Sequence, residues 1–428
     1  MTKFISIAIV AALGVVAFIL PDPLPPEPGS SIAADPPAVS ICAVEEGSGR
    51  STTVSVLSNV NAEGRFTAFA GGVSSGTVVF DTGRSASTSV DVVDVAAVGV
   101  AGALIEQPSS DSTSGSVVFG SSSVSAEGCA AVPASKAVLA GGATVSGDSM
   151  EIQLMNPYAG EAVVEITVRS ESGLESSSQL EAVIVPPRAS RLVDLGDILP
   201  GREVLNVVVD TTSGSVVAVG RYGSNSDSAV WNAVEPSQDW FVPVPTSGGP
   251  RDVVVANATA VAVQYQVDLY GPSGLEEAFE SGTLEPYEIR TFPAEEVSVA
   301  PVGVRVIATG PVAAFMRLAS NSSISLTSGA TTTAGLWHMP GASRIENQVG
   351  RILVFNPGIE DASFIVTGRR SATRAETRTV PGGAIIEFEM FEFDADGYVI
   401  TSDRPVVALW AASSGGAGAA SIGIPVDG

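Results

Sequence analysis

The chain repeats itself about once every hundred residues, and this repetition constrains its fold more than any other feature of the sequence. Four apolar runs each end in an Asn followed by a turn, and these Asn residues lie 97, 101 and 99 residues apart. They are Asn59 in VLSNVNAEG, Asn156 in LMNPYAG, Asn257 in VANATA and Asn356 in VFNPG. A regular period of this length predicts an array of structural units of equal size.

A second motif shares this period. The segments SGSVVFG, SGSVVAVG, TGPVAAFM and DRPVVALW place their first Val at positions 117, 216, 312 and 406, which are 99, 96 and 94 residues apart. Because two separate motifs recur together, we interpret each unit as a copy of one fold.

Between the two motifs, each unit has the alternation of a half-buried β-strand. In AVVEITVRS, Val164, Ile166 and Val168 alternate with polar residues, and VQYQVDLYG repeats the pattern. Alternation with period two and one polar face is typical of antiparallel sheets. The segments LNVVVDTTSGSVVAV, VRVIATGPVAAFM and YVITSDRPVVALW are each interpreted as a closing hairpin.

The sequence therefore predicts an all-β protein, with an N-terminal transmembrane helix followed by a tandem array of about four β-sandwich (Ig-like) repeats. A β-propeller built from the same repeats is the alternative, and it would require two blades in each unit. The predicted segments are a transmembrane signal anchor over 1–20, a Pro-rich linker over 21–38, a divergent first repeat over 39–135, and further repeats over 136–240, 241–337 and 338–428.

The Asn at the end of each apolar run is interpreted as a structural turn residue rather than a ligand contact. Asn tolerates the left-handed backbone conformation, and its side chain can hydrogen-bond within its own turn. A following Pro fixes φ and removes a ladder donor, so the strand stops there. The predicted turn residues are Asn59, Asn156, Pro157, Asn257, Asn356, Pro357 and Gly358.

The N-terminus determines the expected location of the protein. Residues 4–20 form an uncharged, mostly apolar run after Lys3, and at roughly 1.5 Å per residue such a run spans a thin bilayer core. PDPLPPEP follows at once and suits signal peptidase poorly, although SIAAD from Ser31 is an alternative cleavage site. We expect a single-pass protein of the cell membrane, with its C-terminal region outside the cytoplasm beyond an extended Pro-rich linker.

Net charge limits the partners, and the cysteines indicate the compartment. The chain has 46 acidic and 21 basic residues, so phosphate backbones repel it and nucleic acid is not an expected partner.

Cys42 and Cys129 bracket the first repeat, and in an exported protein such a pair is normally oxidised. We predict a disulfide that stabilises the fold by about 4–5 kcal/mol, with two buried free thiols as the alternative.

The residue types that most catalytic and metal sites need are scarce. The single histidine, His338, cannot form a His-based metal site and is the only base available to a Ser-His-Asp triad. GVSSG at 72–76 matches a nucleophile elbow, but a strand rather than a helix is expected after it. His338 and Trp240 are interpreted as inter-domain packing residues, and FDADG at 393–397 as a hairpin turn rather than a calcium loop. We predict no catalytic, cofactor-binding or metal-binding residues and no cofactor.

The motifs over residues 150–222, which include LMNP, VVEITV, VIVPP, LVDL and GSVVA, resemble those of a family of uncharacterised actinobacterial envelope proteins, the domain of unknown function DUF5719. The similarity extends through VVVANATAVAVQYQVDLYGPSG, LEPYEIRTF and GRILVFNPGIE, and the N-terminal membrane segment stands in the family's usual place. The resemblance implies a membrane-anchored, secreted β protein of unknown function, and it supplies no catalytic residue.

We therefore expect a non-enzymatic, membrane-anchored envelope protein that acts as a scaffold or protein-binding module. The expected partner is an envelope or membrane protein. Cell-wall glycan is an alternative, although an aromatic content of 6% disfavours an array of sugar-stacking platforms. A calcium-dependent adhesion module and a carboxylate-based hydrolase are further alternatives, because the spacing of paired carboxylates is three-dimensional and not visible in sequence.

Overall fold

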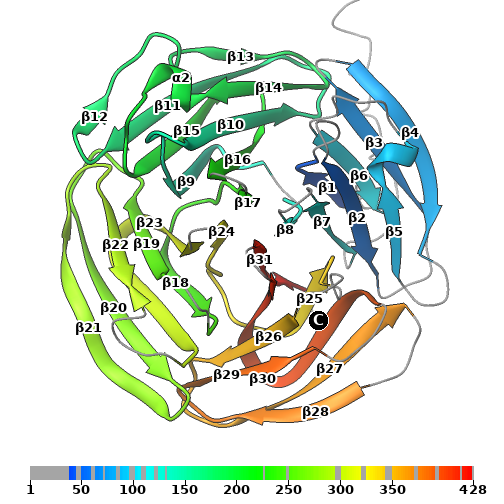
Figure 1. Cartoon of the computed structure of the whole chain (residues 1–428), viewed down its shortest axis with the longest axis vertical. Coiled ribbons are helices and arrows are strands. Elements are labelled where there is room, and N and C mark those ends of the chain that lie inside the picture. The colour runs from blue at the N-terminus through cyan, green and yellow to red at the C-terminus, as the bar shows by residue number, and fades with distance from the viewer. Residues whose placement is uncertain are drawn as a thin grey trace, which may run out of the picture. The chain divides into compact units, whose positions relative to one another are not determined.

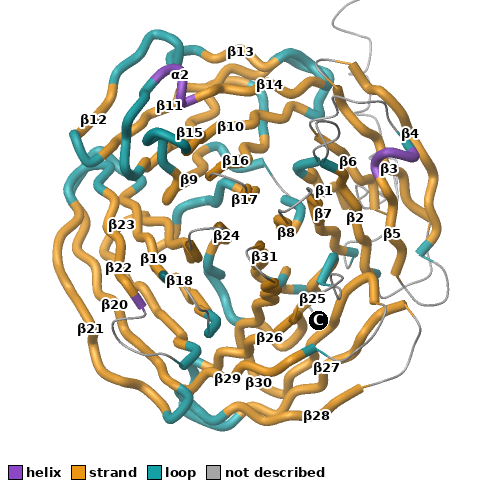
Figure 2. The backbone as a smooth tube through the Cα atoms, in the orientation of Figure 1, coloured by secondary structure: helices purple, strands orange, loops and turns teal. Residues whose placement is uncertain are grey.

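The structure is a computed structural model that describes residues 38–426, except for 45–49, 59–62, 71–72, 83–86, 96–101, 108–111, 120–123, 131–132, 225–226, 247–249, 295–299, 320–323, 343–348, 371–374, 391–394 and 415–416. Within these residues the chain is almost entirely β-strand, with one four-residue helix, α2 (Leu195–Ile198), and one 3-10 turn, η1 (Val92–Asp94) (Figure 2). The all-β prediction is confirmed.

The predicted membrane anchor and nearly all of the predicted linker lie outside the described residues. Among the residues that the structure does describe, no helix is long and apolar enough to cross a membrane.

The first repeat forms two four-stranded antiparallel sheets, in the orders β1-β6-β3-β4 and β5-β2-β7-β8. We call the sheet that contains a repeat's first strand its first sheet, and the other its second sheet. The strands are β1 (Ala38–Cys42), β2 (Ser51–Leu57), β3 (Glu63–Ala70), β4 (Val73–Asp81), β5 (Ser87–Asp91), β6 (Gly102–Gln107), β7 (Thr113–Phe119) and β8 (Val124–Gly128).

The second repeat has the same plan. Its first sheet has the order β12-β11-β15-β9, with β13 also on β11, and its second sheet has the order β14-β10-β16-β17. The strands are β9 (Lys136–Gly142), β10 (Asp148–Asn156), β11 (Ala162–Ser170), β12 (Gly173–Glu175), β13 (Val183–Val185), β14 (Ala189–Asp194), β15 (Leu205–Ser213), β16 (Val217–Ser224) and β17 (Asp227–Asn232).

In the third and fourth repeats one long strand joins the two sheets, β23 in the third and β30 in the fourth (Figure 1). The third repeat has β18 (Ser237–Val244), β19 (Arg251–Asn257), β20 (Val263–Gly271), β21 (Gly274–Leu284), β22 (Ile289–Pro293), β23 (Val302–Ala319) and β24 (Ile324–Ser328). The fourth has β25 (Ala334–Pro340), β26 (Val349–Asn356), β27 (Ala362–Arg370), β28 (Ala375–Val380), β29 (Ala384–Glu389), β30 (Ala395–Ser414), β31 (Ala417–Ile422) and β32 (Ile424–Pro425).

The predicted closing hairpins are wrong. β23 pairs with β20 over residues 303–308 and with β19 over residues 312–318, so one strand leaves the first sheet and enters the second. β30 does the same with β27 and β26. Pro311 and Pro405 interrupt the ladder at these crossings because they lack an N–H, and strands that switch sheets in this way make the corners between them.

The second sequence motif is out of register in the first repeat. Leu57 pairs with Thr113, whereas the equivalent Leu154, also two residues before its Asn, pairs with Ala218. In the structure, Thr113 of the first repeat therefore corresponds to Ala218 of the second. The alignment of the motifs instead predicts that Phe119, six residues later, corresponds to Ala218. The divergence of the first repeat hides this shift from a comparison of short motifs.

Each repeat closes on its own first strand. The second residue after β8, β17 or β24, or the residue that opens β32, bridges to the first strand of the same repeat. The pairs are Ile41 with Ala130, Val138 with Val234, Phe241 with Ala330, and His338 with Ile424. We call β8, β17, β24 and β31 the inner strands, and Figure 1 shows them around the middle of the view, with the other strands of the four repeats outside them.

Successive repeats are joined because each first sheet packs on the second sheet of the next repeat. The first strands make these contacts: β1 with the second repeat, β9 with β19 and β23, β18 with β26 and β30, and β25 with β2 and β7. The last contact brings the fourth repeat back to the first. Residues 38–428 therefore form one compact unit, with a shared hydrophobic core that reaches all four repeats.

Candidate functional site

The inner strands meet one another in order and are held by side chains rather than by a shared ladder. At each junction, a hydroxyl or carboxylate oxygen of one strand accepts a hydrogen bond from a backbone N–H of its neighbour. The junctions are Ser125 Oγ with Val230 N (2.7 Å), Asp227 Oδ2 with Ile324 N (2.8 Å), Thr327 Oγ1 with Ile422 N (3.2 Å) and Ser421 Oγ with Gly128 N (3.1 Å). These four bonds close a circuit at the centre of the repeats.

The side chains at this centre are short and buried. Ala126, Ala229 and Ala420 are each at most 5% exposed, and Ser125 and Thr327 are buried with them. Small residues let the four strands approach closely, and the hydroxyl groups satisfy backbone donors that would otherwise be buried without an acceptor. The centre is a packed polar junction.

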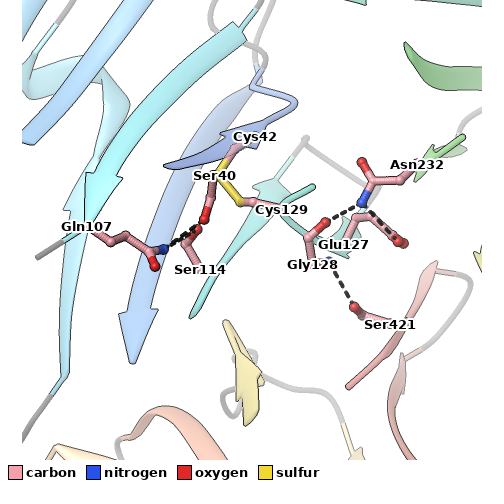
Figure 3. The surroundings of a disulfide bond; sticks show 9 residues. All are labelled: Ser40, Cys42, Gln107, Ser114, Glu127, Gly128, Cys129, Asn232 and Ser421. Atoms are coloured by element: carbon pink, nitrogen blue, oxygen red, sulfur yellow. Dashed lines mark hydrogen bonds between the residues drawn. A yellow bond between two sulfur atoms is a disulfide. The ribbon is translucent and has the colours of Figure 1, made fainter. Parts of the chain in front are cut away.

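Burial raises the pKa of Glu127, an acidic residue on β8 at this junction. Its side chain is 4% exposed, and Asn232 Nδ2 lies 3.4 Å from its Oε1. Asn232 also donates to the carbonyl of Gly128, so it fastens β17 to β8 (Figure 3). Glu127 Oε2 has no hydrogen-bond partner among the described residues.

Burial raises the pKa of the Glu127 carboxyl well above its usual range, and hydrogen bonds from Thr327 and Asn232 lower it by less. The physical cause is that the low-dielectric interior disfavours the charged form. The carboxyl is therefore biased toward its neutral, protonated form, in which it can donate a hydrogen bond as well as accept one.

The disulfide between Cys42 and Cys129 lies two residues from Glu127 (Figure 3). It joins the end of β1 to the residue after β8, with a Cα–Cα distance of 4.5 Å. The first repeat has its own small hydrophobic cluster, which includes both cysteines. Beside it, Gln107 Nε2 donates to Ser40 Oγ (2.8 Å) and Ser114 Oγ (3.1 Å). The disulfide thus fastens the repeat with the most divergent sequence.

The three Asn turns that the structure describes have one hydrogen-bond pattern. Each Asn ends its strand, donates Nδ2–H to the carbonyl four residues later, and accepts at Oδ1 from the N–H two residues later. The donor distances are 2.8 Å for Asn156, 2.7 Å for Asn257 and 2.8 Å for Asn356. Asn59 lies outside the described residues.

None of these three Asn residues has the left-handed backbone conformation that Asn tolerates. The residue with positive φ is the one that faces the turn: Arg188 (φ 51°), Tyr287 (φ 58°) or Gly383 (φ 68°). Each donates its N–H to the carbonyl two residues after the Asn. The Asn keeps its strand conformation because its side chain replaces the backbone partners of the turn.

The other residues that the sequence analysis named lie apart from the junction of the inner strands. His338 is fully buried on β25, and its Nδ1 lies 3.0 Å from Thr113 Oγ1 of the first repeat. Trp240 donates Nε1–H to Val312 O (2.8 Å) within its own repeat, and so fastens the crossing strand. Of GVSSG, residues 73–76 lie in β4.

Two residues of this arrangement were not predicted from the sequence. Asp396, within FDADG, is buried in β30 and accepts hydrogen bonds from Ser87 (3.0 Å) and Ser89 (2.5 Å) of the first repeat. Glu127 gave only the weak signal of one acid in the short-side-chain run VSAEGC. Among the described residues, no group of three or more His, Cys, Asp or Glu side chains could hold a metal ion.

The comparison with protein families gives one match. The model of a family of unknown function, DUF5719, matches residues 92–224 and 228–425, which is more than half of the chain. No curated protein matches.

Several solved structures show a weak likeness. The Thermotoga maritima 1070 structure is 17% identical, with 22% of this chain and 97% of that chain covered and a TM-score of 0.20. A tetra-tandem repeat from the extending region of a large adhesion protein is 10% identical, with coverage of 91% and 99% and a TM-score of 0.12. Two B repeat units of the Staphylococcus aureus collagen binding protein are 8% identical, with coverage of 90% and 98% and a TM-score of 0.13. TM-scores this low carry no argument about this chain.

Proposed function

Because this chain belongs to the family of unknown function DUF5719, we propose a function from its own architecture: it is a non-enzymatic, membrane-anchored protein of the cell envelope that acts outside the cytoplasm as a rigid scaffold or protein-binding module. The observation that carries this proposal is the disulfide between Cys42 and Cys129 at the edge of a closed circuit of inner strands. Disulfides persist in oxidising, extracytoplasmic compartments.

The location agrees with the sequence of the N-terminus. The apolar run over residues 4–20 has the length of a membrane anchor, and the Pro-rich residues that follow suit a spacer. We propose that this segment stays attached and holds the repeats outside the membrane.

The closed circuit favours a platform over a flexible string of domains. Each repeat contributes two sheets, and contacts run from every repeat to the next and from the fourth to the first. We propose a propeller-like arrangement with two blades per repeat, in place of four independent Ig-like sandwiches. Closing a sheet array on itself limits the exposed edges that lead to aggregation.

The composition favours a protein partner. With a formal net charge of −25, the surface repels anionic polymers and attracts proteins with basic patches. A neighbouring envelope or membrane protein with such a patch is the partner that we propose.

Crosslinking in intact cells tests the proposal. The full-length anchored protein carries a photoreactive amino acid at exposed sites, and captured proteins are identified by mass spectrometry. The double variant Cys42→Ser, Cys129→Ser serves as the matched control, because it removes the fastening of the first repeat without touching the anchor. We expect one envelope or membrane protein to be captured repeatedly, and less of it by the control. Capture of none, together with sedimentation of the protein with purified cell wall, would replace this proposal with glycan binding.

A further inference from the structure

A groove lies between the third and fourth repeats, along the strand β29. It is open to solvent and has a volume of about 440 Å³, within the range of typical ligand sites. One wall consists of five consecutive residues of β29, from Ile385 to Glu389, and the other residues of the lining are Thr246, Pro272, Pro301 and Arg351. The groove therefore follows a strand rather than a loop.

β29 is the outermost strand of its sheet, and β26 is the one described strand that pairs with it. Met390 N donates to Gly350 O (2.8 Å), which identifies this pair as hydrogen-bonded. Hydrogen-bonded and non-hydrogen-bonded pairs alternate along an antiparallel ladder. The N–H and C=O groups of Glu387 and Glu389 therefore face away from β26, along the side that β26 leaves open. Those of Ile385 face the same way, but Ile385 is fully buried.

The opposite wall cannot pair with this edge at its prolines. Pro272 and Pro301 have no N–H to donate. Glu387 is held against the wall, because its carboxylate bonds Arg351 Nη1 (2.8 Å) and Thr246 N (2.7 Å). In the described part of the chain, the groups that line this edge thus shape the groove, and none of them is seen to bond the outward N–H groups of Glu387 and Glu389.

Charge and apolar surface indicate the kind of occupant. Arg351 and Glu387 neutralise each other, whereas Glu389 is exposed at the end of β29. Ile386, Phe388 and the two prolines give the groove an apolar lining. An apolar lining that ends at an exposed carboxylate complements a segment that carries both apolar and basic side chains.

We propose that this groove binds an extended segment of a partner protein, which adds to β29 as an antiparallel or parallel strand and alternates apolar residues with Lys or Arg. The inference deepens the proposed binding role and rests on it. Strand addition takes its affinity from main-chain hydrogen bonds and its specificity from alternate side chains. The outward groups of β29 repeat every second residue, about 7 Å apart, which matches the repeat of an incoming strand.

The test uses the full-length protein in detergent and a displayed library of random heptapeptides as the probe. Two variants separate backbone from charge. Glu389→Pro removes an outward N–H that the ladder with β26 does not use, and Pro is tolerated on a strand edge of this kind. Glu389→Ala keeps the N–H and removes the charge. A thermal midpoint close to that of the wild-type protein confirms that each variant is folded.

We expect enriched peptides to alternate apolar and basic residues and to bind the Pro variant at least tenfold more weakly than the Ala variant. Bound peptide should slow amide exchange at Glu387 more than at Phe388, whose N–H already bonds β26. Equal peptide binding by both variants, or protection from amide exchange outside β29, would contradict the proposal that this groove binds the peptide. If Glu389→Pro still captures the crosslinked partner, the protein binds a partner but not through this groove. If even the wild-type protein captures no partner, the proposed binding function itself is wrong.

Discussion

At the scale of single residues, the Asn side chains replace backbone partners at the turns. Asn257 donates Nδ2–H to Val261 O (2.7 Å) and Glu285 O (2.9 Å), and its Oδ1 accepts from Thr259 N (2.9 Å). It is fully buried, so removal of its side chain leaves several backbone groups without partners in the interior.

We expect Asn257→Ala to lower the free energy of unfolding by about 2–4 kcal/mol, because at least two buried hydrogen bonds are lost. Urea denaturation measures this change. Asn257→Asp is the matched control: it keeps the acceptor for Thr259 but presents a carboxylate to the carbonyl groups of Val261 and Glu285, so it should not restore stability. A loss below about 0.5 kcal/mol for the Ala variant, typical of a surface site, would show that the turn does not depend on the side chain.

Glu127 makes the stability of the fold depend on pH. Because burial raises its pKa in the folded protein, the folded state holds a proton that the unfolded chain releases as pH rises above about 4.5. The contribution of Glu127 to stability is therefore complete below the unfolded pKa and is lost as pH rises toward the folded pKa.

We expect Glu127→Gln and the wild-type protein to differ little in stability at pH 4, and the variant to be more stable by more than about 1 kcal/mol at pH 8. Thermal or urea unfolding from pH 4 to pH 8 measures the difference. Glu165→Gln on the exposed face of β11 is the control, and its difference from wild type should stay flat over this range. If the Glu127→Gln curve stays parallel to the wild-type curve, the carboxyl does not titrate as burial requires.

At the scale of elements, the crossing strand is fastened by Trp side chains. Trp240 and Trp337 occupy equivalent positions, and each donates Nε1–H to the crossing strand, at Val312 O (2.8 Å) or Val406 O (2.8 Å). Trp410 is equally buried, but its Nε1 has no hydrogen-bond partner among the described residues. The chain thus offers a matched pair of buried indoles with and without the bond.

We expect Trp240→Phe to cost about 1–2 kcal/mol more stability than Trp410→Phe, because both lose similar ring area and only the first leaves a buried carbonyl short of a donor. Calorimetric or chemical unfolding of the two variants measures the difference. Equal losses would mean that the indoles act by packing alone.

The sequence predicted the strands of each repeat better than their partners. The alternation over residues 162–170 is found in β11, whose burial alternates along the strand. The same residues could not distinguish a hairpin from a strand that changes sheets, because both are two β-prone runs around Gly or Pro. The pairing is decided by partners far along the chain, such as β20 and β19 on either half of β23.

The central junction could not be predicted for the same reason. Its hydrogen bonds join Gly128 to Ser421 and Thr327 to Ile422, which are 293 and 95 residues apart. The repeat period alone does not show that these positions meet. Glu127 lies in a run of small residues whose sequence indicates only an ordinary β-strand. Its burial follows from four repeats meeting, which a single repeat does not show.

At the scale of the whole described unit, the contact between the fourth and first repeats separates a closed circuit from a linear array. Asp396 on β30 accepts hydrogen bonds from Ser87 and Ser89 on β5, more than 300 residues earlier in the chain. In a linear array the first and last repeats would be independent, and a change at one end would not reach the other.

We therefore expect Asp396→Ala to speed amide exchange in β5, while exchange in β11 of the second repeat stays as in the wild-type protein. Two charge-assisted bonds, each of about 1.5–3 kcal/mol, hold β5 to β30, so their loss lowers the cost of opening this edge locally. Asp239→Ala is the control, because it breaks the bidentate pair with Arg305 inside the third repeat and should leave β5 unchanged. Hydrogen exchange followed by mass spectrometry gives both readouts. If β5 exchanges alike in all three proteins, the repeats do not close on one another in solution, and the protein-binding surface would have to be sought on repeats that move independently.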